Sequence, residues 1–346
     1  MSWRGGVLAL AALTSVATAA PFAPPPAPEG GGAIGGLWRQ AVDELEAASR
    51  ARVPALVPPT PRPVAWKARR VASLDLGGAL LALTAGDLDG DGTDELVAVT
   101  ERHVIVLGPH GKGLRERARV AVPAAAPALR PRDPVGAAVV VAGGGGVELW
   151  ARASSAARGA RYAWQGGALI EVGELAGFPW CADRVLELAA GRNYAVDGGA
   201  ELWAVRCRLG EVDRLGRAVV ATAAVTTDGE LTVTVDTRCR GSTAACPATA
   251  RATLTGVGTA IEVADVDRDG ALEVLVAGAG APGDPDAVVV HALGADGFAA
   301  KPRFRRAFLG GVVAIAVGDV DGDGDREAFA AVRLTGARKV DLWLLD

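Results

Sequence analysis

The chain has few of the residues on which most active sites depend. Only 5% of its 346 residues are aromatic, and it has three histidines, His103, His110 and His291. It contains no G-x-S-x-G or H-E-x-x-H pattern, and the glycine-rich segment 108–113 reads as a hairpin turn without P-loop spacing. Tyr162 and Tyr194 are the only tyrosines, and no cluster of His, Lys and Tyr is evident. The sequence therefore favours a protein that is not an enzyme.

Positive charge is not in excess either, because the formal net charge is −4. A nucleic-acid partner requires a basic face, so we expect none. Of the 40 acidic residues, 14 lie in three short segments, so the acidity is local. Beyond the N-terminus, no apolar run reaches the length of about 18 residues that spans a membrane.

The first 19 residues have the pattern of a secretory signal peptide. Arg4 provides a positive start, Gly6–Val16 is apolar, and residues 17–19 form an A-x-A cleavage site. We therefore expect the protein to be secreted, periplasmic or on the cell surface. The alternative is an uncleaved anchor, which would give the only membrane contact that we expect.

Four cysteines remain in this exported chain, an even number that indicates two disulfides. Three pairings are possible, and we favour Cys181–Cys207 with Cys239–Cys246.

Three segments precede the main domain. Residues 20–36 form a Pro-rich and then Gly-rich linker, and residues 37–68 contain a helix followed by an extended segment. The helix is predicted over Leu37–Arg52, because Trp38, Val42 and Leu45 share one face. This face either packs on the main domain or binds a partner.

One acidic pattern occurs three times, in the loops 87–95, 265–273 and 319–327. Each loop has carboxylates at positions 1, 3, 5 and 9, and position 7 can offer a backbone carbonyl. Such an oxygen set suits Ca²⁺, which takes 6–8 oxygen ligands. We therefore predict about three calcium sites. The predicted ligands are Asp87, Asp89, Asp91, Thr93 and Glu95; Asp265, Asp267, Asp269, Ala271 and Glu273; and Asp319, Asp321, Asp323, Asp325 and Glu327.

The loops begin like an EF-hand but do not continue as one. An EF-hand requires a bidentate Glu at position 12 and flanking helices. Position 12 here is Ala98, Val276 or Ala330, within short apolar runs that indicate buried strands. The loops therefore join strand to strand.

A second repeat supports a fold of small sheets. The similar segments Val147–Trp150, Ala200–Trp203 and Val340–Trp343 align with Val104–Leu107 and Val288–His291. Their spacing of about 40–50 residues, with one further copy predicted at 231–235, is typical of β-propellers. We predict an all-β propeller over residues 69–346 with six blades, seven being the alternative. The segment 71–76 is predicted to be an outer strand that closes the last blade.

The strand–DxDGDGxxE–strand pattern resembles the FG-GAP/VCBS repeat of integrin α-type propellers and many secreted bacterial proteins. The resemblance implies that each loop joins the first two strands of a blade and binds calcium. Because no catalytic group is evident, we expect a monomeric interaction or adhesion module whose partner is a protein or a glycan. The alternative is a secreted, lyase-like enzyme acting on a polysaccharide, with its site in the central channel.

Overall fold

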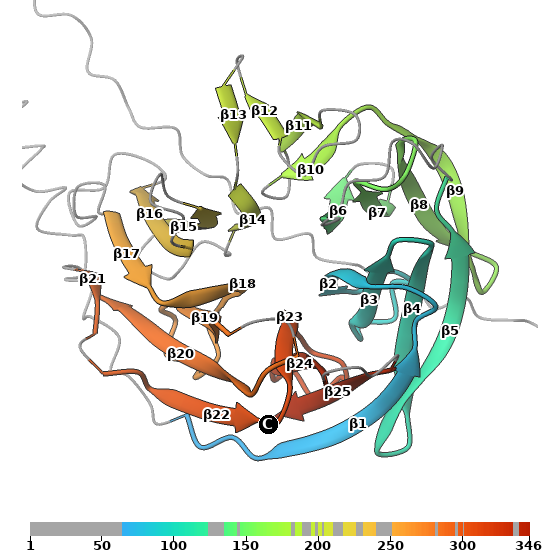
Figure 1. Ribbon diagram of the computed structural model, residues 1–346. Helices are drawn as coiled ribbons and strands as arrows, with labels where there is room; N and C mark the ends of the chain where they lie inside the picture. The colour runs from blue at the N-terminus through green and yellow to red at the C-terminus, as the bar shows by residue number, and fades with distance from the viewer. Residues whose placement is uncertain are drawn as a thin grey trace, which may run out of the picture. The chain divides into compact units, whose positions relative to one another are not determined.

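Antiparallel strands make up the regular structure of the described part of the chain. The computed structural model describes residues 64–123, 135–143, 146–180, 184–188, 195–197, 200–202, 204–209, 217–225, 231–239, 251–280, 283–294, 297–299, 301–334 and 339–346. These residues form six small sheets (Figure 1), which confirms the all-β prediction. In these ranges, no helix is long and apolar enough to span a membrane.

The first three sheets follow one another along the chain. Sheet 1 contains β2 (Leu80–Gly86), β3 (Glu95–Thr100), β4 (His103–His110) and β5 (Gly113–Ala121). Sheet 2 contains β6 (Gly136–Gly143), β7 (Gly146–Ala153), β8 (Gly159–Gln165) and β9 (Ala168–Leu175). Sheet 3 contains β10 (Phe178–Trp180), β11 (Arg184–Leu188), β12 (Ala195–Asp197) and β13 (Ala200–Leu202).

The next two sheets continue this order, and the sixth uses both ends of the described chain. Sheet 4 contains β14 (Ala204–Leu209), β15 (Arg217–Val225), β16 (Leu231–Cys239) and β17 (Arg251–Thr255). Sheet 5 contains β18 (Val257–Ala264), β19 (Glu273–Gly278), β20 (Asp286–Gly294), β21 (Gly297–Phe298) and β22 (Phe304–Phe308). Sheet 6 contains β23 (Gly311–Gly318), β24 (Glu327–Arg333), β25 (Lys339–Leu345) and β1 (Ala68–Asp75).

The hydrophobic core lies between neighbouring sheets. One core cluster joins sheet 1 to sheet 6 through residues such as Leu96 and Phe329, and another joins sheet 1 to sheet 2. Middle strands are therefore buried on both faces, and every residue of β3 is buried. This explains why the sequence after each acidic loop is a continuous apolar run rather than an alternating one.

Strand β1 pairs with β25, although the two lie at opposite ends of the described chain (Figure 1). The pairing is antiparallel and continues beyond the strands, where Lys67 N–H donates to the Asp346 carbonyl at 2.6 Å. This confirms an outer strand of the last sheet close to the predicted segment 71–76, although the strand begins at Ala68 and ends at Asp75.

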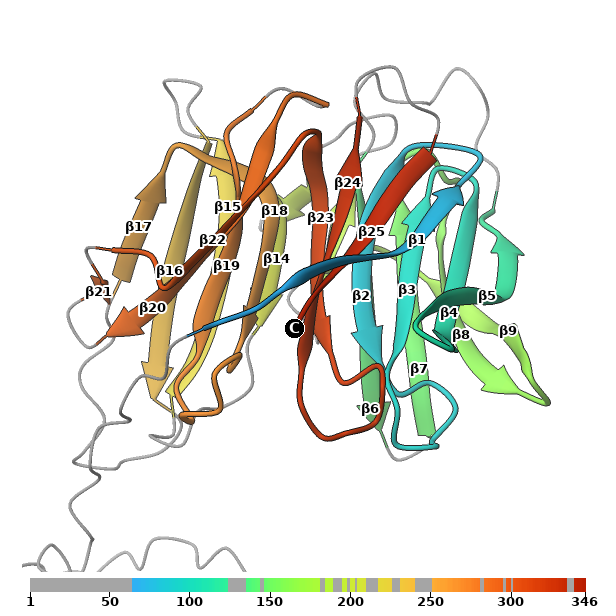
Figure 2. The same cartoon turned by 90° about the horizontal axis from the view of Figure 1, so that it is seen from below.

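The first strands of the sheets also contact one another. Strand β2 contacts β6 and β23, which lies beside it in both views (Figures 1 and 2). Strand β18 contacts β14 and β23, and β10 contacts β6 and β14. Each of the six first strands thus has two first-strand neighbours.

The repeated strand segments do not occupy one structural position, and this part of the prediction was wrong. They lie on the third strand of their sheets at β4, β20 and β25, but on the second at β7 and the fourth at β13. An apolar–polar alternation reports burial rather than strand order, so the shared pattern did not imply a shared place. The additional copy predicted at 231–235 does lie on a third strand, β16.

One further prediction can be compared with the structure, and the others fall on residues that the structure does not describe. The turn predicted at 108–113 is narrower, because β4 extends to His110 and the turn consists of Gly111 and Lys112. The signal peptide, linker and helix lie outside the described residues. So do Cys181 and Cys246, one member of each favoured disulfide, and both disulfides stay predictions.

Candidate metal centres

The three acidic loops occupy the same place in three sheets. They join β2 to β3, β18 to β19 and β23 to β24, which are the first and second strands of sheets 1, 5 and 6. Position 9 is the first residue of the second strand in each case, at Glu95, Glu273 and Glu327. The strand ladder therefore fixes one end of each predicted ligand set. The strands on both sides also confirm that the loops are not EF-hands.

Each loop is held by its own carboxylates, which accept hydrogen bonds from backbone amides. Position 1 accepts from the amide of position 6 at 3.0, 2.8 and 2.9 Å in the three loops in chain order. Position 5 accepts from position 7 at 2.8, 2.7 and 2.7 Å. Position 9 accepts from position 2 at 3.0, 3.2 and 3.0 Å. The three segments therefore share one backbone conformation, which curls around the acidic side chains.

Position 4 requires a left-handed backbone, which glycine adopts without strain. Gly90 and Gly322 each have a φ of 77°, but the 265–273 loop has Arg268 there with a φ of 58°. Arg268 is the only non-glycine residue with a positive φ in the described chain. Its guanidinium forms an ion pair with Asp325 of the 319–327 loop.

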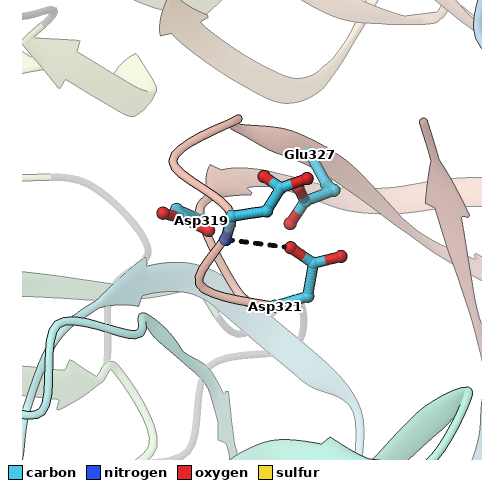
Figure 3. A group of neighbouring side chains, drawn as sticks. Asp319, Asp321 and Glu327 are labelled. Atoms are coloured by element: carbon cyan, nitrogen blue, oxygen red, sulfur yellow. Dashed lines mark hydrogen bonds between the residues drawn. The ribbon is translucent and has the colours of Figure 1, made fainter.

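The carboxylates converge to different degrees in the three loops. In the 319–327 loop all four predicted carboxylate ligands, Asp319, Asp321, Asp323 and Glu327, come together. Figure 3 labels three of them, Asp319, Asp321 and Glu327. The other two loops each bring together three: Asp87, Asp89 and Glu95 without Asp91, and Asp265, Asp267 and Asp269 without Glu273. At position 7, Thr93, Ala271 and Asp325 donate their amides to the loop, and their carbonyls remain predicted ligands.

The geometry of these groups fits a hard divalent cation. Ligand oxygens within each group lie within 4.8 Å of one another, and oxygens on opposite sides of a Ca²⁺ ion are about 4.6–5.2 Å apart. The Oδ1 atom of Asp265 is buried and has no hydrogen-bond partner among the described residues, so it is available to a cation. These are clusters that could hold metal ions such as Ca²⁺.

Without a cation, the glutamates at position 9 are in an unfavourable environment for a charge. Burial, with nearby aspartates, raises the pKa of Glu95 and of Glu327 to about 7. The same causes raise the pKa of Glu273 to about 8. A divalent cation would favour the ionised form of all three.

Two arginines that the sequence analysis did not identify reach two of the loops. Arg117 forms ion pairs with Asp89, at 2.7 Å, and with Glu95. Arg303 forms the corresponding pairs with Asp267 at 2.7 Å and Glu273 at 3.3 Å. They follow the position-9 glutamate by 22 and 30 residues, so no constant spacing in the sequence could have revealed them.

The 319–327 loop also contacts both other loops. Asp94 N–H donates to the Asp319 carbonyl at 2.7 Å, and Asp319 N–H donates to Asp94 Oδ2 at 3.0 Å. The ion pair between Arg268 and Asp325 makes the contact with the third loop. Three candidate cation sites are thus joined at one edge of sheets 1, 5 and 6.

Comparison with known protein families and with curated proteins finds no match for this chain. The interpretation of the loops as metal centres therefore rests on their own sequence and geometry.

Proposed function

We propose that this protein is a secreted, calcium-stabilised β-propeller that serves as an interaction module for a protein or a glycan. The observation that carries the proposal is the acidic loop itself. It occurs at the same hairpin of three sheets, with carboxylate oxygens close enough to share one ion. The predicted signal peptide would deliver the chain to a compartment outside the cytoplasm.

Contacts between the sheets support a propeller with six blades. Followed from β2 through β6, β10, β14, β18 and β23, the contacts between first strands return to β2. The pairing of β1 with β25 joins the two ends of the described chain in one sheet, which is a common way to close such a ring. Each sheet would then be one blade.

Calcium would have a structural role in this arrangement. The ion would neutralise carboxylates that otherwise repel one another within a few ångströms. Because Asp94 and Asp319 connect two of the loops, an ordered loop also strengthens the contact between sheets 1 and 6. The rigid scaffold would hold a binding surface in shape.

The face opposite the metal loops has features of such a surface. A pocket of about 640 Å³ opens there, lined in part by Arg102, Arg333 and Val313. Leu334, which follows Arg333 in the chain, is 47% exposed. Leu309, in the turn between β22 and β23, is 85% exposed. Exposed apolar groups beside a charged pocket are typical of partner-binding sites.

Thermal unfolding in calcium and in chelator tests the calcium role. We expect calcium to raise the melting temperature, because a ligand at 100 times its Kd stabilises the folded state by about 2.7 kcal/mol per site. Equal melting temperatures would refute it.

Capture of partners by the mature protein in calcium, compared with a Leu309→Asp, Leu334→Asp double variant, tests the proposed surface.

A second pocket favours the alternative of a polysaccharide-active enzyme. It measures about 320 Å³ and lies against first strands of several sheets, with Asp94, Arg208, Glu262 and Arg326 in its lining. Arg208 and Glu262 form an ion pair at 3.1 Å, and both are largely buried. Depolymerisation of an acidic polysaccharide that is lost in Glu262→Gln would establish this alternative over the interaction module.

A further inference from the structure

Arg117 is directed at its loop by a distortion of the sheet. In the pairing of β4 with β5, Val106 faces Ala118 and Leu107 faces Glu116, which leaves Arg117 as the extra residue of a β-bulge. Bulges often redirect a side chain in this way. Gly108 provides the space, since a Cβ atom there would lie 2.4 Å from Arg117 Cδ. The guanidinium also lies over the Trp164 ring, 4.8 Å from its centre.

Arg303 has the same role in sheet 5. It directly precedes β22, and its amide donates to the Val290 carbonyl at 2.8 Å. Its side chain is 11% exposed, and the carboxylates that it contacts, Asp267 and Glu273, are each 1% exposed. Both arginines thus bridge the carboxylates of positions 3 and 9.

Sheet 6 has a bulge at the same place but no arginine. In the pairing of β1 with β25, Arg70 faces Trp343 and Ala72 faces Leu342, so the extra residue is Val71. Val71 packs against the core between sheets 1 and 6 and lines a small hollow beside Asp321 and Glu327.

Among the described residues, the four converging carboxylates of the 319–327 loop consequently have no cationic partner, although Arg268 pairs with Asp325 at position 7 of this loop. Arg69 also lines the small hollow, but its guanidinium donates to the Lys112 carbonyl. Within the described residues, no Lys, Arg or His forms an ion pair with Asp319, Asp321, Asp323 or Glu327. This is also the loop in which all four carboxylates converge.

A fixed guanidinium affects cation binding in two opposite ways. It holds two ligands in place, which favours binding, but it repels a second positive charge and occupies ligand oxygens. Because charges a few ångströms apart in a partly buried site interact strongly, we expect the repulsion to be the larger effect.

We propose that Arg117 and Arg303 are positioning residues that order their loops without a metal ion and weaken cation binding there. The 319–327 loop, with Val71 in the equivalent place, is then the tightest site and is filled first. This inference rests on the proposed function, because it assumes that the loops bind cations.

Calcium titration of the full mature protein by calorimetry tests the proposal, with folding checked by circular dichroism. Wild type should show one tight site and two weaker ones. Arg117→Gln, which removes the charge but keeps hydrogen-bond donors, should strengthen one weak site by about tenfold or more. Arg117→Lys is the matched control and should leave that affinity within about threefold.

The reciprocal variant is Val71→Arg, which should weaken the tight site by about tenfold.

Terbium luminescence gives a signal that is specific to the 87–95 loop, because Trp164 lies next to Arg117 and can sensitise an ion bound there. The Trp164→Phe variant should remove that signal. Unchanged or weaker binding in Arg117→Gln would overturn the inference alone. If wild type binds neither calcium nor terbium, the proposed function and the inference both fail.

Discussion

The 265–273 and 319–327 loops have the same backbone and the same carboxylate positions, but their charges are balanced differently. In the 265–273 loop, Arg303 neutralises part of a buried acidic pair. In the 319–327 loop, Asp321 and Asp323 are exposed, and no described cation pairs with the four converging carboxylates. One copy of a repeated motif can therefore be stabilised by a residue outside it, whereas the converging carboxylates of another copy have no such partner among the described residues.

The two loops should differ most in unfolding free energy when the aspartate at position 3, Asp267 or Asp321, loses its charge. Asp267→Asn removes a partner of a buried arginine, so we expect it to lower the free energy of unfolding by about 3 kcal/mol even in chelator. Asp321→Asn should be neutral or slightly stabilising in chelator, because it relieves repulsion, but should lose about 2.7 kcal/mol of stabilisation in saturating calcium. Urea unfolding in both buffers measures these changes. Equal effects of the two variants in chelator would contradict the comparison.

Ionisation of the buried glutamates at position 9 should make the stability of the protein depend on pH. The pKa values of Glu327 and Glu273 are raised to about 7 and about 8 from 4.5, so the metal-free folded protein retains protons that the unfolded chain releases. Its unfolding free energy therefore falls as pH rises from about 4.5 to 8. Calcium requires the ionised form, and its stabilising effect should be small at pH 5 and largest near pH 8.

Melting curves at several pH values, with calcium and with chelator, measure this trend. Glu273→Gln should remove the part of the decline above pH 7, and Glu327→Gln should leave that part in place. A calcium effect that is independent of pH would show that these glutamates are ionised throughout.

The smallest expected effect concerns the position of Arg117. Gly108→Ala places a methyl group against the Arg117 side chain and should destabilise the protein by about 1–3 kcal/mol through overpacking. Combined with Arg117→Gln, the same change should cost less, because the shorter side chain can move away. A double-mutant cycle by thermal unfolding measures this coupling. Additive effects would show that Gly108 has no part in placing Arg117.

Local sequence was sufficient to predict the loops but not their surroundings. The carboxylate spacing and the apolar runs after position 9 identified the metal candidates and the strands, because both signals lie within about a dozen residues. Arg117 and Arg303 were missed, since their approach depends on a bulge and on pairing with a distant strand. The contacts of Asp319 with Asp94 were equally inaccessible, because they join residues 225 positions apart.

The order of strands was also only partly predictable. The Trp-containing segments have the same pattern at β7 and β25 but lie at different places in their sheets. An alternating pattern specifies which face is buried, and tertiary pairing decides which neighbour a strand has.

The most direct test is a crystal structure of the mature protein grown in calcium, with anomalous difference density measured for the bound ions. We predict ion density within each acidic loop, with the highest occupancy at 319–327 when calcium is limiting. Density absent from all three loops at millimolar calcium would contradict the account.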